Sequence, residues 1–200
     1  GLAAVPTSMP LRSGLVGMLI QGGDPKRALL LAQEAQAASP DDPTSLELLA
    51  RAQVAAGETQ QALTTFGKLS SRLPNSPAPL VAMADLQVAA KDLASAEQTL
   101  RKALAVKPDA VEAQQRLISI LLNNKRGDAA ISIAKEVQKQ RKDAAVGYVL
   151  EGEVLSATGK PADAVGPYTE AFRLDKSAQS LIRLHSARLA AGQSAEAAKL

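Results

Sequence analysis

The sequence predicts an all-α protein, an α-solenoid of antiparallel helix hairpins. Three observations predict it: small residues and prolines recur with one period, apolar residues between them follow helical spacing, and aromatic residues make up only 2% of the 200-residue chain. A core without aromatic bulk must be filled by alanine, leucine, valine and isoleucine, which suits closely packed helices. We therefore expect stacked hairpins in which each repeat contacts only its neighbours.

The period is 34 residues, and three residue types carry it. Alanine recurs at this interval from Ala28 to Ala164, and proline recurs at it from Pro40 to Pro108. Glycines follow the same register, the last after a spacing of 33, at Gly23, Gly57, Gly159 and Gly192. We expect a single array over residues 1–200, with repeats at about 9–42, 43–76, 77–110, 111–144, 145–177 and, in part, 178–200.

Each repeat is predicted to form two helices. In the second repeat, Leu46 and Ala50 share one face of a first helix, and Ala62 and Phe66 share one face of a second. Gly57 lies where the first helix should end, because glycine readily takes the left-handed conformation that satisfies the last helical carbonyls.

Local signals mark where these helices begin and end. Asp42 and Ser76 are predicted N-cap residues, because each precedes a proline that suits the first helical position. Pro40 and Pro74 are predicted to terminate the preceding helices.

Five positions depart from the repeat pattern. Lys91 and Lys125 replace the turn glycine, so we expect those corners to be strained or differently shaped. Lys142 and Lys176 replace the terminal proline. Pro167, inside the second helix of the fifth repeat, removes a backbone hydrogen bond and should kink or shorten that helix.

The stretch around Gly159 and Lys160 is interpreted as a turn between helices. A phosphate-binding loop has four residues between its glycines, then lysine followed by serine or threonine. Here six residues separate Gly152 from Gly159, and Pro161 stands where the hydroxyl should be. We therefore expect no nucleotide cofactor.

The residues with reactive side chains form no catalytic pattern. The single histidine, His185, has no nucleophile and orienting acid spaced with it, and the chain has no cysteine. Metal-binding motifs are missing as well, so we expect no enzyme, no cofactor and no metal site. The net charge of +3 is too small to indicate nucleic acid as a partner. The apolar run at residues 15–20 is far shorter than the roughly 18 residues of a membrane span.

The small residues, large apolar residues and prolines of the repeats recur at fixed positions. The second repeat has them at Ala50, Ala62, Phe66 and Pro74, and the third at Ala84, Ala96, Leu100, Ala103 and Pro108. Over residues 9–200 the chain thus resembles the tetratricopeptide repeat family. The resemblance implies a right-handed superhelix of about five and a half repeats that acts as a non-enzymatic scaffold, holding a protein or peptide partner in a concave groove.

In that family, five positions of the first helix line the groove. Mapped onto this chain, the expected partner-binding residues are Glu47, Arg51, Val54, Val81, Asp85, Val88, Gln115, Ser119, Leu122, Asn123, Val149, Glu153, Ser156 and Ile182. This mixture of apolar and polar side chains suits an extended peptide or a partner helix.

Two stretches, "YVLEGEVLSATGKPADAVGPYTEAF" and "LIRLHSARLAAGQSAEA", look like the repeat-rich lipoprotein of bacterial PEP-CTERM/exosortase and exopolysaccharide systems. This second resemblance implies a location in the bacterial periplasm or cell envelope. It also implies an assembly role in protein sorting or polysaccharide export.

A basic stretch in the fourth repeat supports an alternative function. Repeat four holds seven lysines and arginines against four acidic residues, and its second helix ends with Lys135, Lys139, Arg141 and Lys142. These cations are interpreted either as a solvated helix end, favourable with the helix dipole, or as a patch that binds an anion or a polysaccharide.

The ends of the chain indicate that it is a fragment of a longer one. The sequence stops inside a predicted helix, and neither end carries an evident polar capping helix. Open solenoid ends expose apolar surface, so self-association through them is expected.

Overall fold

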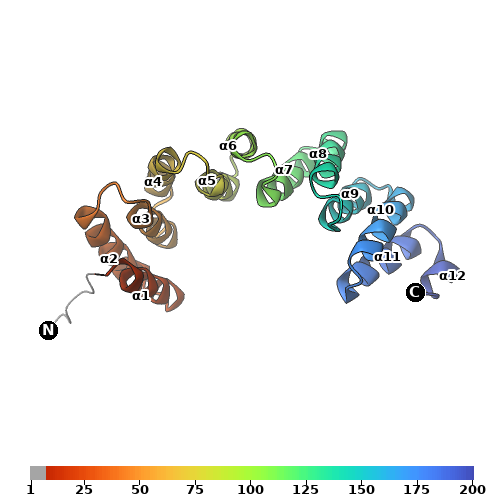
Figure 1. Cartoon of the computed structure of the whole chain (residues 1–200), viewed down its shortest axis with the longest axis horizontal. Coiled ribbons are helices and arrows are strands. Elements are labelled where there is room, and N and C mark those ends of the chain that lie inside the picture. The colour runs from red at the N-terminus through yellow and green to blue at the C-terminus, as the bar shows by residue number, and fades with distance from the viewer. Residues whose placement is uncertain (1–7) are drawn as a thin grey trace. The chain divides into compact units, whose positions relative to one another are not determined.

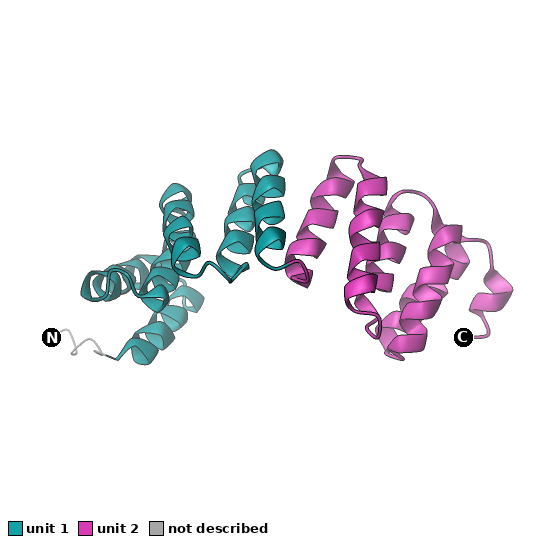
Figure 2. Ribbon diagram, turned by 45° about the horizontal axis from the view of Figure 1, so that its top comes forward, with its two compact units in different colours: residues 1–107 teal, residues 108–200 magenta. Residues whose placement is uncertain are grey.

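The computed structural model describes residues 8–200, and all regular structure in that part of the chain is helical. Residues 1–7 of the expected array lie outside the described residues. The chain divides into two compact units, residues 1–107 and 108–200, called here the N-terminal and C-terminal units (Figure 2). The division falls near the end of the third predicted repeat, after its second helix.

Each unit consists of helix hairpins in chain order (Figure 1). The N-terminal unit contains α1 (Met9–Gln21), α2 (Pro25–Ala38), α3 (Pro43–Ala55), α4 (Thr59–Arg72), α5 (Ala78–Ala89) and α6 (Leu93–Val106). The C-terminal unit contains α7 (Val111–Asn123), α8 (Gly127–Gln140), α9 (Val146–Ala157), α10 (Pro161–Leu174), α11 (Ala178–Ala190) and α12 (Ser194–Ala197). Consecutive helices within each unit pack against one another, and each predicted repeat holds one pair. The predicted all-α solenoid is confirmed.

The corner inside each hairpin has one backbone conformation. At the second repeat, Gly57 has φ +78°, and the N–H of Glu58 donates to the carbonyl of Gln53 at 2.8 Å, as in a Schellman motif. Lys91 and Lys125 take the same left-handed conformation, with φ +63° and +58°. Those two corners therefore have the same shape as the glycine corners. The expected strain is present because each lysine has a Cβ and still adopts a left-handed backbone conformation.

One predicted cap is confirmed and one is wrong. The Asp42 carboxylate accepts a hydrogen bond from the N–H of Ser45 at 2.9 Å at the start of α3. Ser76, in contrast, does not cap α5: the cap position is Pro77, and the Ser76 hydroxyl lies 3.4 Å from the N–H of Ala78. The helix therefore begins at Ala78, one residue later than predicted, and the N–H of Val81 donates to the carbonyl of Pro77 at 3.0 Å.

Helix ends follow the repeat register whether or not a proline is present. α2, α4 and α6 each end two residues before a proline, as predicted. α8 and α10 end two residues before Lys142 and Lys176. Pro167 lies inside α10, which has 14 residues like the other full-length second helices, so Pro167 does not shorten it and the alternative, a kink, stays a prediction.

Small side chains permit close packing inside the hairpins. In α3 and α4, Ala50 and Ala62 are fully buried, and Ala50 packs in one cluster with Phe66. In α9 and α10, a Cβ added to Gly152 would lie 2.7 Å from the ring of Tyr168, so only glycine fits there. Small residues at these positions therefore let the two helices of a hairpin pack closely.

Candidate partner-binding surface

The predicted groove residues lie on the first helices of the hairpins. In the N-terminal unit, Figure 1 shows the first helices α3 and α5 below the second helices α4 and α6. At 3.6 residues per turn, Glu47, Arg51 and Val54 share one side of α3, and all three are exposed. With Asp85 and Val88 of α5 they form what we call the N-terminal first-helix face.

Two valines on this face repeat at equal exposure. Val54 is 41% exposed and Val88 is 40% exposed, one period apart on α3 and α5. Val81, which the sequence places in the groove, is only 5% exposed and belongs to the core instead. The N-terminal first-helix face therefore combines a repeated apolar position with charged groups around it.

The C-terminal unit carries the remaining predicted residues on α7, α9 and α11. Its exposed members are Gln115, Ser119, Asn123, Ser156 and Ile182, and its half-buried members are Leu122, Val149 and Glu153. Leu122 and Asn123 help to line a cavity of about 480 Å³ between the end of α7 and the end of α9.

Two of these predicted residues, Glu153 and Ser156, form polar contacts with other helices of the C-terminal unit. Glu153 on α9 accepts a hydrogen bond from Arg183 on α11 at 3.2 Å. Burial raises the pKa of the Tyr168 phenol above 10.0, while a hydrogen bond with Ser156 opposes the rise. Glu153 and Ser156 therefore support neighbouring helices, and substitutions there would disturb more than a binding surface.

Three of the four cations in the basic stretch have acidic partners. Lys135 lies 3.7 Å from Glu151 and Lys139 lies 3.8 Å from Glu136. Arg141 approaches Asp109 at 3.7 Å and also donates to its backbone carbonyl at 3.1 Å. Lys142 is exposed, with no carboxylate within 4.0 Å among residues 8–200. Since paired cations attract a further anion less strongly, this arrangement does not favour the anion-binding alternative.

Other reactive residues occupy structural positions. Gly159 has φ +77° at the turn before α10, and Lys160 donates its N–H to the carbonyl of Leu155 at 2.9 Å, as at the other corners. His185 is exposed on α11. Within residues 8–200, no three His, Asp or Glu side chains are grouped to hold a metal ion. Nor does any described helix combine the length and the apolar character of a membrane span.

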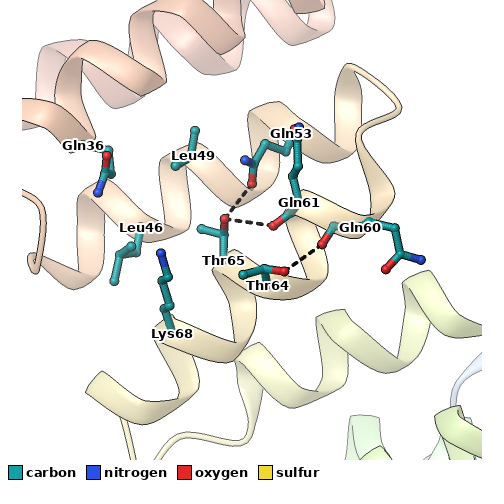
Figure 3. Close-up of a pocket in the computed structure, with 9 residues that line it drawn as sticks. All are labelled: Gln36, Leu46, Leu49, Gln53, Gln60, Gln61, Thr64, Thr65 and Lys68. Atoms are coloured by element: carbon teal, nitrogen blue, oxygen red, sulfur yellow. Dashed lines mark hydrogen bonds between the residues drawn. The ribbon is translucent and has the colours of Figure 1, made fainter.

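One cavity, of about 380 Å³, lies between α2, α3 and α4 and was not predicted from the sequence (Figure 3). It is lined by Gln36, Leu46, Leu49, Gln53, Gln60, Gln61, Thr64, Thr65 and Lys68. A signal was present in the repeat register: Gln53 stands where the fourth and fifth repeats have Leu121 and Leu155. A buried polar residue at an apolar position indicates a local requirement for hydrogen bonding.

Known proteins were compared with the chain. The model of the tetratricopeptide repeat-like domain matches residues 33–191. No curated protein sequence matches the chain significantly.

Solved structures with the same fold share little sequence with it. A tetratricopeptide repeat protein of Thermus thermophilus is 22% identical, with 91% of this chain and 100% of that chain covered and a TM-score of 0.61. PilW, described as a type IV pilus biogenesis factor, is 15% identical, with coverages of 97% and 90% and a TM-score of 0.68. YrrB, described as having an unusual peptide-binding site, is 16% identical, with coverages of 90% and 91% and a TM-score of 0.59. The family match extends over most of the residues, so the chain belongs to the tetratricopeptide repeat-like domain family.

Proposed function

We propose that the chain is a non-enzymatic scaffold that binds a peptide or a segment of a partner protein along its first-helix surfaces. We further propose that it serves a bacterial envelope assembly such as PEP-CTERM protein sorting or exopolysaccharide export. The resemblance of the last two repeats to the lipoprotein of those systems supports the choice of system.

One observation carries the binding proposal: the exposed valines of α3 and α5 repeat at one register beside exposed charges. Val54 and Val88 offer apolar contacts at a fixed interval, while Glu47 and Arg51 flank the first of them on α3. A face of this kind provides apolar anchors with a polar rim, which is the usual composition of a protein interface.

The test uses the whole chain and a fluorescently labelled C-terminal sorting peptide of a PEP-CTERM protein. Binding is measured by fluorescence anisotropy for the natural chain, for Arg51→Glu and for Val54→Asp. We expect each substitution to weaken binding at least tenfold, because each changes an exposed side chain on the proposed surface.

Lys26→Glu is the matched control, because it makes the same charge change at an exposed position on the second helix α2. Glu153 is left unchanged, since its reversal would break the pair with Arg183. Equal binding by Arg51→Glu, Val54→Asp and Lys26→Glu would show that the first-helix surface is not the binding site.

A further inference from the structure

A polar groove lies on a different side of α3 from the first-helix face. Leu46, Leu49 and Gln53 line it, and at 3.6 residues per turn their mean direction lies about 130° around the helix from the exposed residues of that face. The cavity of about 380 Å³ shares Gln36, Leu46 and Lys68 with a second cavity of about 460 Å³. The two therefore form one continuous groove between α2 and α4, which we call the second-helix groove.

The base of this groove has unused hydrogen-bonding capacity. Gln53 is 7% exposed and Thr65 is 6% exposed. The Thr65 hydroxyl has one hydrogen but two acceptors, Gln53 Oε1 at 2.8 Å and the carbonyl of Gln61 at 3.0 Å (Figure 3). A carboxamide can take part in four hydrogen bonds. Among the described residues, the Gln53 side chain makes one hydrogen bond, the one that it accepts from Thr65. Such a group can accept or donate further bonds to a ligand.

The walls of the groove carry amide groups and one cation. Gln36 on α2 donates to the carbonyl of Pro40 at 3.4 Å, which leaves its own side-chain oxygen as an acceptor. Gln61 on α4 is exposed, and Figure 3 shows its side chain alongside Gln53. Lys68 is the single charged residue lining the first cavity, and its side chain reaches from α4 toward α3. The lining thus offers both donors and acceptors around a positive centre.

An ion pair borders one end of the groove. Asp41, in the loop before α3, pairs with Arg72 in the last turn of α4, and both line the second cavity. Because Arg72 is engaged with a carboxylate, Lys68 is the cation available to a ligand.

The combination of glutamine, threonine and lysine in this groove is repeated once along the chain, in the third repeat. One period after Gln53, Thr65 and Lys68 come Gln87, Thr99 and Lys102, and two periods after come Leu121, Ile133 and Glu136. Among residues 8–200, the side-chain oxygen of Gln87 is buried and has no hydrogen-bond partner. Both copies of the set lie in the N-terminal unit, and the C-terminal unit replaces the amide with leucine and the cation with glutamate.

We propose that the second-helix groove binds an extended peptide segment with a glutamate or aspartate side chain placed at Lys68. A peptide backbone offers one N–H and one C=O per residue, which matches carboxamides that donate and accept. Leu46 and Leu49 provide an apolar floor for alternate side chains. From Gln60 to Arg72 the groove follows about 18 Å of α4, at about 1.5 Å per residue, which accommodates about five extended residues. This site uses none of the residues of the proposed first-helix surface.

The test follows side-chain amide signals by NMR in the full chain. The probes are two pools of end-capped hexapeptides, one with glutamate fixed at the third position and one with lysine fixed there. We expect the glutamate pool to shift the amide signals of Gln36 and Gln61 in a saturable way, and the lysine pool to shift them at least fivefold less.

Two pairs of variants localise the binding. Thr64→Trp fills the groove from an exposed position, and Ser132→Trp is its match in the fourth repeat, because both hydroxyls donate to the carbonyl four residues earlier at 3.0 Å. We expect Thr64→Trp to abolish the shifts and Ser132→Trp to preserve them. Lys68→Glu should reverse the preference between the pools, while Lys102→Glu in α6 should leave the preference at Gln36 and Gln61 intact.

Three outcomes would overturn the proposal. The first is an absence of saturable shifts with the glutamate pool. The second is shifts that survive Thr64→Trp but vanish in Arg51→Glu, which would place the peptide on the first-helix face and leave the proposed function standing. The third is saturation of the same amide signals by maltohexaose with no response to either peptide pool, which would assign the groove to carbohydrate.

Discussion

Replacing Lys91 with glycine should stabilise the N-terminal unit. Lys91 has φ +63° at the corner between α5 and α6, a conformation that the corners at Gly23, Gly57, Gly159 and Gly192 reach with glycine. The corner is held by backbone bonds only: the Lys91 N–H donates to Val88 at 2.9 Å and the Asp92 N–H donates to Gln87 at 2.8 Å. Removal of the exposed lysine side chain therefore leaves both hydrogen bonds in place.

The size of the effect follows from two opposing contributions. A left-handed conformation costs a residue with a Cβ about 1–2 kcal/mol. Glycine lacks that cost but loses about 0.5–1 kcal/mol more conformational entropy on folding. The difference raises the free energy of unfolding by about 0.5–1 kcal/mol, equivalent to about 1–4 °C in the melting temperature of a chain of this length. Lys125, with φ +58° in the C-terminal unit, should respond in the same way.

The measurement is urea unfolding followed by far-UV circular dichroism. The transition midpoint should rise for Lys91→Gly while the slope m stays unchanged, because the buried surface is the same. Lys91→Ala should leave the midpoint unchanged, since alanine removes the charge but keeps the Cβ. Lys102→Gly, at a right-handed position inside α6, should lower the stability by about 1 kcal/mol.

The controls make the explanation refutable. If Lys91→Gly and Lys102→Gly lower the midpoint equally, backbone strain at the corner contributes nothing and the reasoning is wrong. If Lys91→Ala raises the midpoint as much as Lys91→Gly, the gain comes from the lost charge.

Further predictions concern other positions in the hairpins. Gly67→Ala should raise the free energy of unfolding by about 0.5–1 kcal/mol, because the added Cβ has no other atom within 4 Å. Gly147→Ala should lower the free energy of unfolding by about 1–3 kcal/mol, because the added Cβ would lie 2.6 Å from a backbone nitrogen of α8. Phe66→Ala should lower it by about 3–5 kcal/mol in urea unfolding, through the cavity left between α3 and α4. Hydrogen bonds from Ser95 hold the pKa of the Asp92 carboxyl below 3.8, so NMR titration should find it there and Ser95→Ala should raise it. Because the pKa of Asp92 is lowered in the folded state, the stability that Asp92 contributes is present above about pH 3.8. It is lost as the pH falls through the lower pKa of the folded state.

The candidate site was predictable only in part. The 34-residue register placed Arg51, Val54 and Val88 correctly on an exposed side of the first helices. It also placed Val81 there, because position within a repeat does not reveal how deeply a neighbouring helix covers a side chain.

The hairpin period, the corners and most helix ends follow from the amino-acid sequence alone. Each depends on residues a few positions apart, such as the Asp42 cap and the bond from Glu58 to Gln53, so composition and spacing suffice to predict it. Which polar side chains pair with one another, in contrast, depends on the packing of the helices. Glu153 accepts a hydrogen bond from Arg183, which is 30 residues away in the sequence. Thr65 on α4 donates to Gln53 on α3 at the base of the second-helix groove. Such pairs form only when the packing of the helices brings the two side chains together. That packing depends on all the contacting surfaces at once, so the spacing of residues in the sequence does not predict the pairs.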